Sequence, residues 1–304
     1  MTYRQKLLEV TRYYHFDVAI VDGMMAQYGH MLDNIKCILD EVDIYSIMAF
    51  HTYLREGRTV QRWRSMFDWL YTYYCELSYV RRYDGVVTRS HEDKAFLEKL
   101  IPTQNFGVLP PWFEGLTEEF LSIPAQRPPH NRLLFVGAMA NPKNVDAVVY
   151  FVKEILPIVQ RQIPDVALVI AGSNPTPAVH DLAAFAGVEI TGAVDSLTPF
   201  YAESAINIVP LRMGGGVITK TLNGLAAARP TVSTTFGISG TGVKPGRDLI
   251  VADTPEQFAE AIIHLLQDEP YWLKIAQKGR EFVKSHYNWQ EAMGLFESFI
   301  HSNC

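Results

Sequence analysis

Residues 206–230 combine an apolar run, three consecutive glycines and a lysine in an order that suits phosphate binding. The apolar run is typical of a buried strand, and Gly214, Gly215 and Gly216 follow it. Lys220 falls in the first turn of the helix predicted next. Glycine lets a backbone approach a ligand closely, and a helix N-terminus offers unpaired N–H groups and partial positive charge. The pattern predicts a diphosphate site for a nucleotide or nucleotide-sugar; the alternative is a plain strand–helix turn whose glycines only relieve crowding.

The composition of the chain narrows the classes of protein to which it can belong. With 304 residues, 48% hydrophobic and 20% charged, the chain is expected to form two globular domains. A formal net charge of −6 argues against general nucleic-acid binding. Three scattered cysteines, Cys37, Cys75 and Cys304, indicate neither a disulfide framework nor a zinc cluster. The chain opens without an apolar signal segment and has no apolar run of about 18 residues, so we expect a cytoplasmic protein.

From residue 132 onward, apolar runs alternate with amphipathic segments, which predicts a parallel sheet covered by helices on both faces. The predicted strands are 132–137, 166–172, 188–192, 205–211, 230–235 and 248–252. The predicted helices are 144–163, 177–186, 255–267, 269–287 and 289–301. A doubly wound α/β domain of this kind binds its ligand at the carboxyl edge of the strands, where we expect the three glycines to lie.

The first half of the chain repeats this alternation less completely. The predicted strands are 16–21, 44–50, 85–88 and 106–109, with helices at 2–14 and 59–82. Since a helix, and not a strand with a glycine-rich turn, opens the chain, we expect a shortened Rossmann-like domain. The expected parts are a first domain at 1–115, a linker at 116–131, a second domain at 132–287 and a helix at 288–304 able to cross back to the first domain.

An ordered series of motifs resembles the family 4 glycosyltransferases, retaining enzymes of the GT-B architecture, in which two Rossmann-like domains face a cleft. Residues 135–146 resemble the family's opening strand with its glycine and lysine loop, and 209–216 with Lys220 resemble its diphosphate loop and helix. Further matches are at 169–173 and 192–201, which border the nucleotide base, at 248–258 and 287–289, and more loosely at 49–51 and 87–90. The order of these motifs is more specific than any one of them.

The resemblance implies transfer of a hexose from a nucleotide-sugar donor to a glycan, lipid-linked or small-molecule acceptor, with retained anomeric configuration. Lys143 and Lys220 would neutralise the diphosphate leaving group, so no metal or other cofactor is expected. His51, placed after the predicted strand 44–50, would touch the transferred sugar; a capping or core histidine is the alternative. The donor-binding residues implied are Gly137, Gly172, Ser173, Val194, Gly214, Gly215, Gly216, Thr219 and Asn223.

The chain departs from the family pattern at positions that bind the donor. Asn223 stands where the family usually has a glutamate for the ribose hydroxyls, and Gly215 replaces an acidic residue eight positions earlier. Ala138 replaces an arginine. An amide bonds a hydroxyl without charge assistance, which weakens donor binding by about 1–2 kcal/mol. The alternatives to an enzyme are a non-catalytic partner subunit or decayed homologue and, more distantly, a nucleotide-sugar epimerase. The shortened first domain predicts a homodimer or heteromer through residues 1–115.

A segment rich in arginine and aromatic residues lies at the start of the long helix predicted in the first half. It contains Arg55, Arg58, Arg62, Trp63, Arg64, Phe67 and Trp69. We favour an ordinary helix whose aromatic side chains pack inward and whose arginines are solvated; an acceptor-binding or peripheral membrane-surface face is the alternative. The nearby Glu41-Val42-Asp43 is reminiscent of an Asp-x-Asp metal motif, but it is predicted at a helix end in a chain of another fold, so we reject a metal site.

Overall fold

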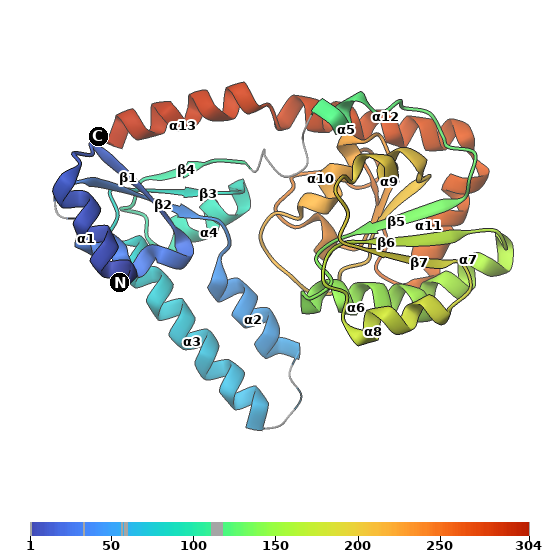
Figure 1. Cartoon of the computed structure of the whole chain (residues 1–304), viewed down its shortest axis with the longest axis horizontal. Coiled ribbons are helices and arrows are strands. Elements are labelled where there is room, and N and C mark those ends of the chain that lie inside the picture. Colours follow the sequence, from blue (N-terminus) through green and yellow to red (C-terminus); the bar gives the residue numbers. More distant parts are fainter. Residues whose placement is uncertain (1, 33, 56, 58–59, 111–117, 304) are drawn as a thin grey trace. The chain divides into compact units, whose positions relative to one another are not determined.

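The computed structural model describes residues 2–303 apart from 33, 56, 58–59 and 111–117 (Figure 1). The chain forms two compact units. The first comprises Met1–Pro110, Gly215–Val217 and Trp289–Cys304, and the second comprises Pro111–Gly214 and Ile218–Asn288. Residues 116 and 117 of the predicted linker lie outside the described residues, and the rest of that segment belongs to the second unit.

The first unit is built on a four-stranded parallel sheet in the order β1-β2-β3-β4. Its strands are β1 (Val18–Asp22), β2 (Lys36–Glu41), β3 (Gly85–Thr88) and β4 (Phe106–Val108). Its helices are α1 (Tyr3–Tyr13), α2 (Tyr45–Arg55), α3 (Val60–Val80), α4 (His91–Leu100) and α13 (Trp289–Asn303), with a 3₁₀ segment at Gly23–Met31. The core between sheet and helices includes Leu39, Val86 and Leu97, whose side chains are fully buried.

The C-terminal helix α13 packs on the sheet of the first unit. The Phe299 ring lies against Gly85 and Gly107, where an added Cβ atom would come within 3.0 and 2.9 Å of ring atoms. At the end of the helix, Asn105 Nδ2 donates a hydrogen bond of 2.7 Å to Asn303 Oδ1. The two glycines are therefore needed for the close approach of α13 to β3 and β4.

The prediction of a strand at 44–50 is wrong. The second strand of the sheet is β2, in which Cys37, Ile38 and Leu39 are buried, and the predicted strand residues lie in and just before helix α2. In α2 the apolar residues pack against α3 at helical spacing, as the contact between the Phe50 and Trp69 rings at 4.8 Å illustrates. His51 consequently lies within α2, and the reason for placing it at a strand end no longer holds.

The helices α2 and α3 pack side by side and extend away from the four-stranded sheet of their unit (Figure 1). The prediction that the aromatic side chains of this segment pack inward holds for Trp69, which stacks on Tyr53 with ring centroids 5.9 Å apart. It is wrong for Trp63 and Phe67, which are 64% and 63% exposed because they lie on the opposite face of α3. Arg58 lies outside the described residues. Within the described part of the chain, no helix combines the length and apolar character needed to cross a membrane.

The second unit is built on a six-stranded parallel sheet in the order β10-β9-β8-β5-β6-β7, as the alternation of strands and helices predicts. Its strands are β5 (Arg132–Val136), β6 (Ala167–Ala171), β7 (Val188–Gly192), β8 (Ile206–Val209), β9 (Thr231–Ser233) and β10 (Ile250–Val251). Its helices are α5 (Glu118–Ser122), α6 (Pro142–Tyr150), α7 (Leu156–Gln162), α8 (Pro177–His180), α9 (Thr198–Glu203), α10 (Thr219–Ala226), α11 (Pro255–Gln267) and α12 (Glu269–His286). Short 3₁₀ turns lie at Asp181–Ala184 and Phe236–Ile238.

The helix predicted at 144–163 is continuous but changes its winding in the middle. A π-helical turn, Phe151–Ile155, joins α6 to α7. Pro157 follows it in the first turn of α7, where a proline has no N–H to offer to the preceding turn. Phe151, Val152 and Ile155 are fully buried, so the wider turn still presents its apolar face to the core.

Candidate functional site

The strands β5 and β8 are neighbours at the centre of the second sheet. After β5 the chain continues to β6 on one side of this pair, and after β8 it continues to β9 on the other side. β5 pairs with β6 on one side and with β8 on the other. In open α/β sheets, the crevice beyond the carboxyl ends of the strands at such a switch point is the usual ligand site. The glycine loop after β8 and the loop after β5 therefore lie at the edge where a ligand is expected.

Backbone hydrogen bonds fix the loops that follow β5, β6 and β7. Gly137 N–H donates to Ala171 O at 3.0 Å, and Met139 N–H donates to Ser173 O at 2.8 Å. Gly172 N–H donates to the carbonyl of Gly192, just before the loop that contains Val194. These loops form one connected rim, so Gly137, Gly172, Ser173 and Val194 are held on the same sheet edge.

The glycines of this rim are required for different reasons. A Cβ atom on Gly172, whose φ is +151°, would lie 1.8 Å from Gly137 O. One on Gly137 would lie 2.7 Å from Asn144 Nδ2. Gly214 and Gly216 have φ values of +138° and +69°, which favour glycine, and the nearest atom to a Cβ on Gly214 is Lys143 Cδ at 3.6 Å. Gly137 and Gly172 thus allow the loops after β5 and β6 to pack closely, whereas Gly214 and Gly216 shape the loop after β8.

Two helices begin at this edge, and each carries a lysine in its first turn. Asn141 caps α6, with its side chain accepting from Lys143 N–H at 3.1 Å. In the first turn of α10, the Lys220 ammonium donates to Asn144 Oδ1 at 3.1 Å and lies 5.6 Å from the centre of the Phe135 ring. Asn144 in turn donates to Ala138 O at 2.9 Å. Lys220 is therefore held by a side chain of α6, which joins the two helix starts.

The two ammonium groups are close enough to affect each other. Burial, and then the neighbouring charge of Lys143, lower the pKa of Lys220 to about 8. No carboxylate forms an ion pair with either lysine within the described ranges. An anion bound at this edge would stabilise both charges, since it supplies the opposite charge that the protein does not.

Three polar residues that the sequence analysis did not single out position this edge. Asn144 orients Lys220, as described above. Asn207 Nδ2, buried below α10, donates to Lys220 O and Thr231 Oγ1, both at 3.2 Å. Arg212 Nε donates to Asp146 Oδ2 at 3.0 Å, and the Arg212 guanidinium stacks on the Tyr150 ring at 4.3 Å. The available signal was a polar residue inside an apolar strand, Asn207, but its partners become evident only in the folded chain.

Asn223 lies one turn beyond Lys220 on α10 and is buried, with 6% of its surface exposed. The fully buried hydroxyl of Tyr201 lies near the Asn223 side chain but makes no hydrogen bond of normal geometry. Burial raises the pKa of Tyr201, and the nearby Asn223 amide lowers it. Thr219 begins α10 and is partly exposed at the same edge. His51 lies on α2 of the first unit, where its ring is 6.4 Å from that of Phe50.

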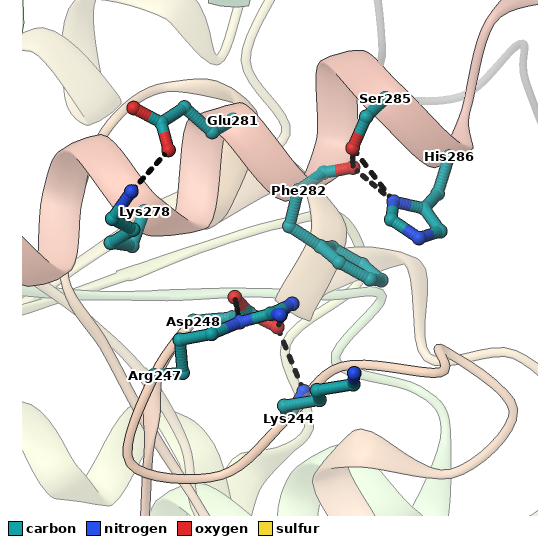
Figure 2. A network of polar contacts seen from close by, with 8 residues as sticks. All are labelled: Lys244, Arg247, Asp248, Lys278, Glu281, Phe282, Ser285 and His286. Atoms are coloured by element: carbon teal, nitrogen blue, oxygen red, sulfur yellow. Dashed lines mark hydrogen bonds and ion pairs between the residues drawn. The ribbon is translucent and has the colours of Figure 1, made fainter.

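Two cavities of the second unit lie away from the glycine loop. One of about 850 Å³ lies at the amino ends of β5 and β6, the edge opposite the glycine loop. Another, of about 610 Å³, lies between α12 and the loop before β10. Figure 2 shows that its charges pair with one another: Arg247 Nε donates to Asp248 at 2.7 Å, and Lys278 donates to Glu281 at 2.7 Å. Four of the charged side chains that line this cavity are therefore already paired with one another. Among the described residues, no group of three or more His, Cys, Asp or Glu side chains is placed to hold a metal ion.

Comparison with known protein sequences finds a family model and a curated relative that each match part of the chain. Residues 130–268 match the family model described as glycosyl transferases group 1. A curated relative, an uncharacterized 44.6 kDa protein in the cps region of Klebsiella pneumoniae, is 27% identical over 183 residues. This match covers 57% of the chain and 46% of the relative, so it spans about half the length of that relative.

Comparison with solved structures extends over nearly the whole chain. Sucrose-phosphate synthase from Thermosynechococcus elongatus matches with a TM-score of 0.72 and 17% identity, over 99% of this chain and 78% of the other. Pneumococcal O-GlcNAc transferase GtfA, in complex with UDP and GlcNAc, matches with a TM-score of 0.70 and 11% identity, over 99% and 59%. The chain thus has the α/β fold of GT-B glycosyltransferases, with two parallel sheets, and residues 130–268 are similar to glycosyl transferases group 1.

Proposed function

We propose that the chain is a glycosyltransferase whose second unit binds the diphosphate of a nucleotide-sugar between the starts of α6 and α10. The observation that carries the proposal is the pair Lys143 and Lys220. Both begin helices at the switch point between β5 and β8, and neither has a carboxylate partner among the described residues. The nucleoside is expected along the rim that contains Gly137, Gly172 and Val194. A nucleotide-sugar donor is the same kind of ligand as the UDP named for the GtfA complex.

The chemistry we propose is transfer of a hexose with retained anomeric configuration, as in family 4. When the bond between the anomeric carbon and the diphosphate breaks, negative charge develops on the departing diphosphate. Lys220, Lys143 and the N–H groups at the start of α10 would stabilise that charge, which removes the need for a metal ion. The acceptor class remains a glycan, a lipid-linked or a small molecule, bound by the first unit, and we expect a cytoplasmic enzyme that associates through residues 1–115. His51 has no assigned role, because it is not at a strand end.

A second candidate is a non-catalytic partner subunit that binds the donor weakly. Asn223 favours it, because an amide stands where the family carries a ribose-binding carboxylate, and this amide is buried beside Tyr201. An amide makes a weaker bond to a ribose hydroxyl than a carboxylate does. A donor site that has lost this contact would still hold the diphosphate.

A donor screen followed by a turnover assay tests the two candidates. We expect UDP-, GDP- or ADP-linked hexoses to raise the melting temperature, and one of them to release its nucleoside diphosphate in the presence of a suitable acceptor. Binding without release of nucleoside diphosphate, with or without acceptors, would favour the partner subunit. A chain that binds none of these donors is not a glycosyltransferase of the proposed kind.

The substitution Asn223→Glu sharpens this test. If the residue faces a ribose, the added carboxylate should tighten donor binding by about five- to thirty-fold, corresponding to 1–2 kcal/mol. Asn223→Gln is the matched control, since it has the same length without the charge. Equal donor affinity of the two variants would mean that residue 223 does not touch the ribose.

A further inference from the structure

A continuous apolar stripe runs along the outward face of α3 in the first unit. Its members, called here the α3 stripe, are Val60, Trp63, Phe67, Leu70, Tyr71 and Tyr74, each between 46% and 86% exposed. Their spacing of three and four residues places them on one helix face. Soluble proteins rarely expose an apolar surface of this extent without a binding partner.

The α3 stripe is not needed to hold the two helices α2 and α3 together. The opposite face of α3 makes those contacts through Trp69, which packs on Phe50 and Tyr53 of α2. Farther along the same face, the Glu76 carboxylate accepts hydrogen bonds from both the backbone N–H and the hydroxyl of Ser46. These contacts join the helices through the inward face and leave the aromatic side chains of the α3 stripe exposed.

The sequence around the start of α3 is strongly basic. Between residues 54 and 64 the chain has four arginines, Arg55, Arg58, Arg62 and Arg64, against the single acid Glu56, whereas the whole chain has a formal net charge of −6. Arg64 is exposed beside the α3 stripe, and Arg62 lies over the Tyr53 ring at 5.1 Å. Positive charge is thus concentrated in the part of the sequence where the stripe begins.

We propose that the α3 stripe docks on the surface of an anionic lipid bilayer, with α3 lying in the plane of the interface. Tryptophan, tyrosine and phenylalanine rings favour the boundary between headgroups and acyl chains, and arginines beside them attract anionic headgroups. The helix lies on the surface and does not span it, because Asp68 and Arg64 border the stripe. A second copy of the chain, meeting the first through the same stripe, is the other occupant that an apolar stripe fits. Its stripe would bring the same local excess of arginine, which gives that charge no complement.

Flotation with lipid vesicles tests the proposal on the full chain. Vesicles of phosphatidylcholine alone are compared with vesicles of equal parts phosphatidylcholine and phosphatidylglycerol. We expect binding to the anionic vesicles, weakened by added salt, and little binding to the neutral ones. The double variant Trp63→Ser/Phe67→Ser should reduce binding to the anionic vesicles by about tenfold or more. Arg64→Glu should reduce it less and mainly at low salt.

The matched control is Tyr13→Ser/Leu295→Ser, which removes two apolar side chains that are 80% and 65% exposed elsewhere on the first unit. This control should bind vesicles as the wild type does, and both double variants should keep the wild-type circular dichroism and melting temperature. Failure of the wild type to bind anionic vesicles, or equal binding by the stripe and control variants, would overturn the proposal. A concentration-dependent dimer that the stripe variant abolishes, without vesicle binding, would assign the α3 stripe to self-association instead. None of these measurements depends on whether the chain transfers a sugar.

Discussion

The two units of the chain use similar parallel sheets but differ in how fully they bury them. In the second unit, β8 and β9 are buried along their whole length. Residues of the helices α6, α7, α11 and α12 pack with the strands in its core. In the first unit, only β3 is buried at all its residues, while the edge strand β1 leaves Ile20 52% exposed. A cavity of about 420 Å³ lies beside β1, lined largely by apolar residues of α1 and the 3₁₀ segment.

This difference separates two kinds of binding surface. The second unit presents a fixed rim whose loops are joined by hydrogen bonds, which suits a small ligand of constant shape. The first unit presents open apolar surfaces, on β1 and along the α3 stripe, which suit extended partners. Buried polar side chains such as Asn144 and Asn207 fix the rim of the second unit, whereas the side chains of the α3 stripe are exposed.

The largest expected effect is on stability, from Trp272→Ala. The Trp272 side chain is fully buried, its Nε1–H donates to Ala205 O at 2.7 Å, and the Arg229 guanidinium lies 5.5 Å from its ring centre. Removing it should lower the free energy of unfolding by about 3–5 kcal/mol. Trp69→Ala, in the more exposed packing of α2 and α3, should cost about half as much. Urea denaturation followed by circular dichroism measures the free energy of unfolding of both variants. An equal decrease in the two variants would contradict the difference in packing between the units.

A smaller effect is expected on donor binding from Asn144→Ala. This variant removes the acceptor of the Lys220 ammonium and the donor to Ala138 O, so Lys220 is no longer held at the rim. Affinity for a nucleoside diphosphate should fall by about tenfold. Asn105→Ala, which breaks the asparagine pair on the first unit, is the control and should leave binding unchanged. Unchanged binding in Asn144→Ala would mean that Lys220 needs no such support.

The pH dependence of binding tests the electrostatics of the rim. The pKa of Lys220 lies below its ordinary value, at about 8, because burial and Lys143 disfavour the charged form. A bound diphosphate favours that form and raises the pKa again, so binding should take up a proton above pH 8 and weaken as the pH rises further. Calorimetry in buffers of different ionisation enthalpy measures the uptake. The Lys220→Met variant should show none; an identical uptake in wild type and variant would place the titrating group elsewhere.

The smallest effect is expected from Lys143→Ala. Loss of this charge should raise the pKa of Lys220 towards its ordinary value, although burial still holds it down. The proton uptake should therefore move to higher pH, while the affinity at pH 7 falls only a few-fold, about 1 kcal/mol, because Lys220 remains. If Lys143→Ala lowered the affinity for the nucleoside diphosphate more than Lys220→Ala does, the roles assigned to the two lysines would be reversed.

The sequence predicted the second unit well because its inner strands β5, β6, β8 and β9 are largely buried and so appear as continuous apolar runs. The strand at Val188–Gly192 and the helix at Pro255–Gln267 have the predicted bounds. In the first unit, β2 was missed since it ends in Asp40 and Glu41, and acidic residues are uncommon in buried strands. The nearby apolar run in α2 was mistaken for the strand, because a short run does not distinguish the two structures by itself.

The candidate site was predictable only in part. The glycines and Lys220 follow a strand in a recognisable order, so their place at the sheet edge could be inferred. The support from Asn144 could not, because it depends on how α6 packs beside α10. For α3, aromatic residues occur on both helix faces, so the sequence alone did not indicate which face packs against α2.

Calorimetric titration of a nucleoside diphosphate into the wild type and Lys220→Ala tests the central claim most directly. UDP, GDP and ADP serve as probes at pH 7 in the absence of divalent metal. We predict measurable affinity for at least one of them and a rise in its dissociation constant of about tenfold or more in the variant, the value of a charged hydrogen bond. Equal dissociation constants for the wild type and the variant would contradict the assignment of the donor site to the start of α10.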